Sequence, residues 1–239
     1  MRKPILKLQP GFPITNQFVV SEHLGTGWEG EVYRVEEKNT GIERVAKIFY
    51  PHRNVKNKSI NFYAKKLHKL RNCSILIHYL SQEEFYYGDK MYAVLLSDFV
   101  DGIPLEQFLT RQPGKRLLPF QALHLLHALA KGIEDIHLNK EYHGDLHSEN
   151  VIVQRYGLGF DLKLIDMYHW GRPSKANYQF DMECLIRIFY DALGGKKHYQ
   201  KHPDSIKEIC CGLRKDIMRD RFRSVSQLRA HIENLEWSY

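Results

Sequence analysis

Residues 142–153, YHGDLHSENVIV, hold a dense group of polar side chains able to do chemistry. Asp145 and Asn150 stand five positions apart, His143 and His147 flank the aspartate, and Gly144 directly precedes it. Three interpretations fit these residue types: a phosphate-transfer loop, a metal site, or a polar loop without chemistry. A zinc site on the two histidines would need a continuous helix through Gly144 and a third ligand. The other motifs of the chain decide between these interpretations.

A glycine-rich stretch precedes this loop. GTGWEGEV places Gly25, Gly27, Gly30 and Val32 in the pattern G-x-G-x-x-G-x-V. A dinucleotide-binding fold would need a helix after the third glycine, but residues 31–37, EVYRVEE, are typical of a strand. We therefore predict a β-hairpin whose backbone N–H groups lie over nucleotide phosphates, with an ordinary glycine-rich hairpin as the alternative.

Lys47 lies between the two motifs, within the apolar run RVAKIF. A lysine inside an apolar strand costs several kcal/mol, on the order of a buried charge, unless it finds a partner. A phosphate group would supply that partner. The alternative is an edge lysine whose amine reaches water.

The pattern of elements changes along the chain. Residues 17–50 and 74–100 are strand-like, and residues 57–71 place Ile60, Tyr63, Leu67 and Leu70 on one helical face. These runs predict a five-stranded sheet with one helix. From residue 119 the pattern is mainly helical, and further helices are expected within the ranges 180–193, 203–213 and 224–237.

The ordered motifs GTGWEGEV, VAK, LLSDFVDG, HGDLHSEN and LIDM resemble those of the protein kinase superfamily. The loop has the H-G-D-L-H form found in aminoglycoside and choline kinases. The resemblance covers nearly the whole chain. It implies an α+β, bilobal kinase-like fold with a five-stranded antiparallel N-lobe sheet and a mainly helical C-lobe. It also implies a single domain over residues 1–239, with an N-lobe at about 1–97, a hinge at about 98–102 and a C-lobe at about 103–239.

The resemblance implies a role for each motif residue, with ATP and Mg²⁺ as cofactors. Asp145 would orient the acceptor hydroxyl, Asn150 and Asp166 would hold Mg²⁺, and Lys47 would clamp the α- and β-phosphates. Asp181 would hold the catalytic loop by hydrogen bonds. The implied nucleotide-binding residues are Gly25, Gly27, Gly30, Val32, Val45, Lys47, Asp98, Val100 and Ile152.

Two departures from the family pattern concern the charged residues. The helix at 57–71 contains no glutamate to pair with Lys47, and its corresponding position is Tyr63 or Ala64. Three outcomes are open: another acid, such as Glu31, substitutes, the nucleotide itself orients the lysine, or catalysis is weak. Gly144 stands where many protein kinases have the arginine that binds a phosphorylated loop.

A third departure concerns the activation segment. Only fourteen residues separate Asp166 from Asp181, the D-F-G motif reads D-M-Y, and no A-P-E occurs. We therefore expect no regulation by loop phosphorylation. The lost segment ordinarily docks peptides, which favours a small-molecule kinase. However, only 58 residues follow Asp181, and they end in DRFRSVSQLRAHIENL, similar to the last helices of protein kinases.

These features predict a minimal Ser/Thr protein kinase that transfers the γ-phosphate of Mg-ATP to a hydroxyl group. The alternatives are a small-molecule kinase of the aminoglycoside, choline or sugar type, and an ATP-binding pseudokinase. The expected partner is a protein substrate or a small-molecule acceptor. We expect a monomer without a nucleic-acid partner.

The composition is ordinary for a soluble globular protein. Hydrophobic residues make up 43% and charged residues 26% of the chain, and the net charge is +7. No apolar run is long enough for a signal peptide or a membrane span, and the four cysteines form no C-x-x-C pair. We expect a cytoplasmic protein with reduced thiols and no membrane partner.

Overall fold

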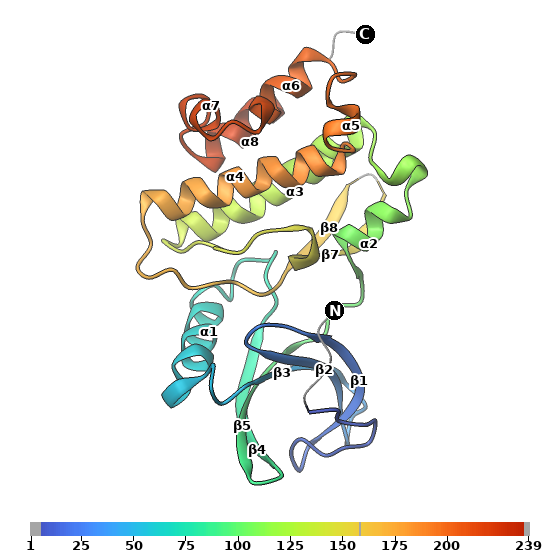
Figure 1. Cartoon of the computed structure of the whole chain (residues 1–239), viewed down its shortest axis with the longest axis vertical. Coiled ribbons are helices and arrows are strands. Elements are labelled where there is room, and N and C mark those ends of the chain that lie inside the picture. Colours follow the sequence, from blue (N-terminus) through green and yellow to red (C-terminus); the bar gives the residue numbers. More distant parts are fainter. Residues whose placement is uncertain (1–5, 158, 237–239) are drawn as a thin grey trace. The chain divides into compact units, whose positions relative to one another are not determined.

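The computed structural model describes residues 6–157 and 159–236 and divides them into two compact units (Figure 1). The first unit contains residues 6–72 and 76–100, and the second contains residues 73–75 and 101–236. The division falls between residues 100 and 101, within the range predicted as a hinge. That the two units act as a single domain stays a prediction.

The first unit is built on one antiparallel sheet with the strand order β1-β2-β3-β5-β4. This arrangement confirms the predicted five-stranded sheet, and β3, the strand of Lys47, is its central strand. The elements are β1 (Phe18–Thr26), β2 (Gly30–Glu37), β3 (Glu43–Phe49), a 3-10 turn (Val55–Asn57), α1 (Lys58–Lys69), β4 (Tyr79–Tyr87) and β5 (Lys90–Asp98).

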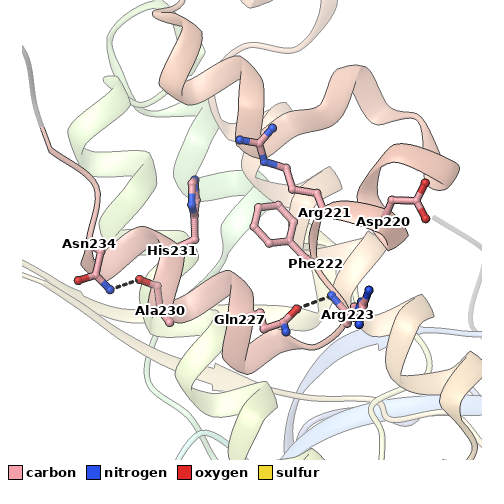
Figure 2. Close-up of a pocket in the computed structure, with 8 residues that line it drawn as sticks. All are labelled: Asp220, Arg221, Phe222, Arg223, Gln227, Ala230, His231 and Asn234. Atoms are coloured by element: carbon pink, nitrogen blue, oxygen red, sulfur yellow. Dashed lines mark hydrogen bonds between the residues drawn. The ribbon is translucent and has the colours of Figure 1, made fainter.

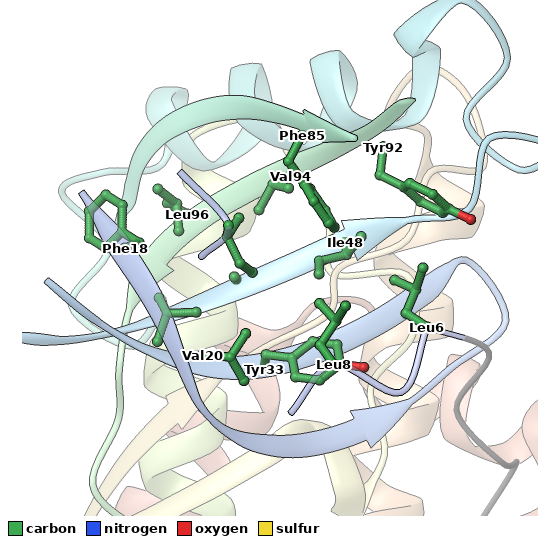
Figure 3. Close-up of a cluster of buried hydrophobic side chains, with 13 residues drawn as sticks. Leu6, Leu8, Phe18, Val20, Tyr33, Ile48, Phe85, Tyr92, Val94 and Leu96 are labelled. Atoms are coloured by element: carbon green, nitrogen blue, oxygen red, sulfur yellow. The ribbon is translucent and has the colours of Figure 1, made fainter. Parts of the chain in front are cut away.

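The curved sheet of the first unit surrounds a hydrophobic cluster (Figure 3). Alternate residues of each strand point into it, because successive side chains of a strand face opposite sides of the sheet. Leu6 and Leu8, from the segment before β1, complete the cluster. Its strand residues are Phe18, Val20, Tyr33, Val35, Ala46, Ile48, Phe85, Tyr92, Val94 and Leu96, together with Ile14 from the segment before β1.

Helix α1 has the buried face that the sequence pattern predicts. Ile60, Tyr63 and Leu67 are buried, as is Leu70 at the residue that ends the helix. The spacing of three and four residues places these side chains on one face of the helix. The first turn has no acidic residue to stabilise it, so the burial of this face is what stabilises the helix.

The second unit is mainly helical, as expected. Its long helices α3 and α4 contact each other and lie side by side in Figure 1, and α8 packs on α3. The helices are α2 (Leu105–Thr110), α3 (Pro119–Leu138), α4 (Lys175–Ala192), α5 (Lys196–Tyr199), α6 (Asp204–Cys210), α7 (Lys215–Arg221) and α8 (Val225–Glu233). Short 3-10 turns cover Pro113–Lys115, Ser148–Asn150 and Cys211–Leu213.

A small sheet with the order β6-β7-β8 accompanies these helices. It consists of β6 (Ile103–Pro104), β7 (Val151–Tyr156) and β8 (Phe160–Leu164). Strand β7 begins directly after Asn150, and β8 ends two residues before Asp166. Asn150 and Asp166 therefore lie next to the ends of two neighbouring strands of this sheet. Along residues 6–157 and 159–236, no helix has the length and apolar character needed to cross a bilayer.

Candidate active site

The glycine-rich stretch forms a β-hairpin, as predicted. Strand β1 ends at Thr26 and β2 begins at Gly30, and the Gly27 amide donates to the Gly30 carbonyl at 2.8 Å. A Cβ at Gly30 would lie 1.9 Å from the Ile48 carbonyl oxygen, so only glycine allows β3 this close. A Cβ at Gly25 would meet no described atom within 4 Å, which leaves open space at the hairpin.

Lys47 lies on β3 directly opposite Val32 of β2. Since Ala46 and Ile48 point into the hydrophobic cluster, Lys47 and Val32 lie on the other face of the sheet. The Lys47 amine contacts a Glu29 carboxylate oxygen at 3.4 Å and the Tyr63 hydroxyl at 3.4 Å. It also lies 4.4 Å from the centre of the Tyr63 ring, a cation–π distance.

Glu29, from the turn between β1 and β2, is an acidic partner of Lys47, whereas Glu31, the acid suggested from the sequence, faces the core. Glu31 lies on the core face of β2 and is fully buried. Its carboxylate accepts hydrogen bonds from the Tyr33 hydroxyl at 2.5 Å, the Tyr50 hydroxyl at 3.0 Å and a backbone amide. Burial, followed by the Glu31 carboxylate, raises the pKa of Tyr33 above its ordinary value.

The residues expected around adenine are divided between the two units. Val45 is the second residue before Lys47 on β3 and shares its face, and it pairs with Ser97 of β5. The Asp98 carboxylate accepts from Arg44 at 3.3 Å and contacts His78 at 2.8 Å, and Val100 ends the first unit. Their roles at a nucleotide stay predictions.

Ile152 belongs to the second unit, where it pairs with Pro104 of β6 and with Lys163 of β8. It is half-buried, and its side chain faces Gly102, since a Cβ there would lie 2.7 Å from Ile152 Cγ2. Its contact with an adenine ring likewise stays a prediction.

Asp145 and Asn150 are brought together in the second unit. The Asn150 side-chain amide donates to the Asp145 carbonyl at 2.8 Å and lies 3.4 Å from its carboxylate. Because the Nδ2 group is used in this way, the amide oxygen is the part of Asn150 suited to a cation. The five-residue spacing seen in the sequence corresponds to a loop closed on itself.

Asp181 of α4 holds the backbone of this loop, which confirms the role predicted for it. One carboxylate oxygen accepts from the His143 amide at 2.7 Å and from His137 Nε2 at 3.0 Å, and the other accepts from the Gly144 amide at 2.8 Å. The Asp181 side chain is fully buried. A buried carboxylate with several donors fixes the loop directly before Asp145.

The zinc alternative for His143 and His147 is wrong. Gly144 has φ of +83°, so the two histidines are not on one helix. His143 is fully buried, its Nε2 donates to the Ile165 carbonyl at 3.1 Å, and its Nδ1 accepts from the Asp145 amide at 3.3 Å. Both ring nitrogens are thus used to shape the loop.

His147 is the basic neighbour of Asp145. Its ring nitrogens lie 3.8 Å from the carboxylates of Asp145 and Glu149. The interaction with Asp145 raises the pKa of His147, and Glu149 and Asp166 add to the effect. The same interaction, with help from His143 and Asn150, holds the pKa of Asp145 below its ordinary value.

Asp166 lies next to this loop. The preceding Ile165 donates its amide to the Asn150 carbonyl at 3.1 Å, and the Tyr168 amide donates to the His143 carbonyl at 2.8 Å. Asp166 itself has φ of +54°, a left-handed conformation that aspartate tolerates better than most residues. The second unit therefore assembles Asp145, Asn150 and Asp166. That Lys47 and the hairpin of the first unit meet them around one triphosphate stays a prediction.

A separate hollow of about 530 Å³ lies in the second unit around the start and the exposed side of α8 (Figure 2). Arg221, Phe222 and His231 lie in its wall, and the Gln227 side chain accepts from the Arg223 amide at 2.8 Å. None of the catalytic residues named above lines it. Its lining residues are Asp220, Arg221, Phe222, Arg223, Gln227, Ala230, His231 and Asn234.

Comparison with known proteins gives one family. The protein kinase domain family matches residues 18–185. The chain is 30% identical over 198 residues to Calcium-dependent protein kinase 4 of Plasmodium berghei, covering 77% of this chain and 35% of that protein. It is 24% identical over an alignment of 242 residues to the probable serine/threonine-protein kinase YbdM of Bacillus subtilis, covering 95% of this chain and 90% of that protein.

The fold has counterparts among solved structures. The kinase domain of Mycobacterium tuberculosis PknI, solved as a double mutant, superposes with a TM-score of 0.67 at 17% identity, covering 95% of this chain and 98% of that one. This likeness confirms the predicted fold. The chain spans between 1% and 35% of the length of most of the curated relatives that it matches.

Proposed function

Since the chain belongs to the protein kinase family, we propose that it is an ATP-dependent kinase that phosphorylates Ser or Thr residues of protein substrates. The observation that carries the proposal is the closed loop of the second unit. There the Asn150 amide nitrogen bonds the Asp145 carbonyl, and the Asp181 carboxylate holds the two residues before Asp145.

Asp145 would act on the acceptor hydroxyl. Its side chain is about half exposed, with 52% of its surface open, so an acceptor can reach it. Transfer of a phosphoryl group needs little covalent work from the protein, so orientation of the nucleophile is the main task of such a carboxylate. The His143 and Gly144 amides donate to Asp181, which fixes the backbone directly before Asp145.

Asn150 and Asp166 would hold Mg²⁺. An amide oxygen and a carboxylate are the hard oxygen ligands that Mg²⁺ prefers, and the ion usually takes only one or two of them beside phosphates and water. When bound, Mg-ATP supplies the transferable γ-phosphoryl group, and the metal neutralises charge on its oxygens.

Lys47 and the hairpin would bind the phosphates. The Lys47 side chain is only 14% exposed, and its amine already has a carboxylate and a phenol nearby, so its direction is set before a nucleotide arrives. The open space at Gly25 lets backbone N–H groups come close to an anion. Glu29 would take the part of the helix glutamate that this chain lacks.

Protein Ser and Thr residues are proposed as acceptors because several relatives are named as serine/threonine-protein kinases, including the probable serine/threonine-protein kinase YbdM. The test is incubation with Mg²⁺ and ATP labelled in the γ-phosphate, in the presence of unrelated proteins, aminoglycosides and sugars. Label on proteins supports the proposal. Label only on small molecules would replace it with a small-molecule kinase.

Two variants make the test specific. Asp145→Asn should reduce transfer about a hundredfold or more while ATP still raises the melting temperature. Asp161→Asn, an exposed aspartate of β8 in the same unit, is the matched control and should transfer at the wild-type rate. Full activity of Asp145→Asn would remove Asp145 from the mechanism. Stabilisation by ATP without any transfer in the wild type would indicate a pseudokinase.

A further inference from the structure

The segment after Asp166 is tied to the catalytic loop by one tryptophan. The indole Nε1 of Trp170 donates to the Gly144 carbonyl at 2.8 Å, and the Trp170 amide donates to the Tyr142 hydroxyl at 2.6 Å. The Tyr142 hydroxyl in turn donates to the Gly171 carbonyl at 2.9 Å. One hydrogen bond therefore holds the indole against the carbonyl of the residue before Asp145, and two more hold the backbone of Trp170 and Gly171.

Gly144 makes room for this arrangement. A Cβ at Gly144 would lie 2.8 Å from the Tyr168 carbonyl oxygen, 2.9 Å from Tyr142 and 3.1 Å from Trp170 Cδ1. The residue also has φ of +83°, which favours glycine. The Tyr168 carbonyl, the Tyr142 ring and the indole together fill the space into which a side chain at position 144 would point.

The anchored indole is nevertheless open to solvent, with 63% of the Trp170 surface exposed. Its ring centre lies 4.7 Å from that of Tyr168, so two aromatic rings form a small platform. A hydrogen-bonded aromatic loses little conformational freedom when a partner binds, which makes a fixed, exposed ring an effective contact residue.

We propose that Trp170 is a specificity-determining residue of the acceptor site. A protein substrate would place a large apolar side chain on the indole, within two residues of its acceptor Ser or Thr. The inference rests on the proposed kinase function and on the position of the indole beside Asp145. A basic substrate side chain is disfavoured there, because Arg172 and Lys175, both exposed, follow closely in the same segment.

The test compares two peptides that share one acceptor serine, one with leucine or phenylalanine and one with serine at the flanking positions. Wild-type protein should prefer the apolar peptide in kcat/KM by about tenfold or more, the range of one good apolar contact. Trp170→Ala should lose that preference. Trp170→Phe keeps an apolar ring without the N–H donor, so it should keep most of the preference even if its kcat falls.

The control is Leu138→Ala, which removes an exposed apolar side chain of α3 in the same unit and should leave the preference unchanged. If the ratio of kcat/KM between the apolar and the serine peptide is the same in wild type and Trp170→Ala, the inference is overturned. Transfer of phosphate to both peptides would still support the proposed function. If wild type transfers phosphate to no peptide, the proposed function and the inference fall together.

A binding measurement covers the case in which Trp170→Ala does not fold. The apolar peptide should change the tryptophan emission of the wild type, and Trp170→Phe, which retains the other two tryptophans, should show no such change. An identical change in both proteins would contradict a contact at Trp170.

Discussion

Removing the Asp181 carboxylate is the most direct perturbation of the candidate site, because it acts on the loop without touching a substrate. The carboxylate accepts two backbone amides, those of His143 and Gly144, and the ring of His137. In Asp181→Ala both buried amides would lose their acceptor. Hydrogen bonds to a charged group contribute about 1.5–3 kcal/mol each, so losing these two predicts a destabilisation of about 3–6 kcal/mol.

Asp181→Asn provides an intermediate case. It keeps one acceptor oxygen and turns the other into a donor that faces an amide, so we expect about half of the loss, roughly 1.5–3 kcal/mol. The matched control is Asp161→Ala, whose exposed side chain should change stability by less than about 0.5 kcal/mol.

Urea unfolding followed by circular dichroism measures these differences. With a slope of about 2 kcal/mol per molar urea, Asp181→Ala should lower the midpoint by about 1.5–3 M and leave the slope unchanged. Phosphate transfer, measured below the midpoint, should fall as well because the backbone before Asp145 is no longer held. A midpoint within about 0.5 M of the wild type would refute the reasoning that Asp181 fixes this loop.

Three further predictions concern other parts of the chain. Gly30→Ala should lower the melting temperature by about 10 °C or more, since its Cβ would lie 1.9 Å from the Ile48 carbonyl oxygen and β2 and β3 would have to separate; a melting temperature within about 2 °C would contradict that contact. Burial raises the pKa of the Cys184 and Cys210 thiols to about 12, so both thiols should resist iodoacetamide at pH 8 in the folded protein and react after unfolding. Mass spectrometry measures the modification, and modification of either thiol within minutes in the folded state would contradict the prediction. The pKa of His147 is raised in the folded state, so the stabilisation from its ion pair with Asp145 is fully present below about pH 6.5 and is lost as the pH rises through the folded pKa. His147→Gln should therefore lower the free energy of unfolding by about 1 kcal/mol or less at pH 5.5 and leave it unchanged at pH 9. An equal loss at both pH values would exclude the ion pair as the cause.

Much of the fold follows from short-range patterns. The 3.6-residue spacing of Ile60, Tyr63 and Leu67 corresponds to the buried face of α1, and the run around Gly30 continues as a strand rather than a helix. Element type depends mainly on neighbouring residues, so it can be read from the chain. The grouping of Asp145 with Asn150 is equally local, because the two residues stand five positions apart in one loop.

Other parts of the site could not be predicted from these patterns. Glu29 rather than Glu31 contacts Lys47, because the register of β2 against β3 turns Glu31 toward the core and leaves the turn residue on the side of the lysine. Val32 pairs with Lys47, so its direct neighbour Glu31 must face the other side of the sheet. The register itself was not known from the sequence.

The sequence by itself determined which chemical groups the protein has, in which order, and on which kinds of element, since these depend on residue identity and near neighbours. Only the tertiary structure decided which distant groups meet. The Gly144 amide donates to the Asp181 carboxylate, and the Trp170 indole donates to the Gly144 carbonyl. Such contacts depend on the path of irregular segments and on the packing of α4, which no periodic pattern encodes. The physical reason is that they join residues 26 and 37 positions apart, held by packing and hydrogen bonds rather than by local propensity.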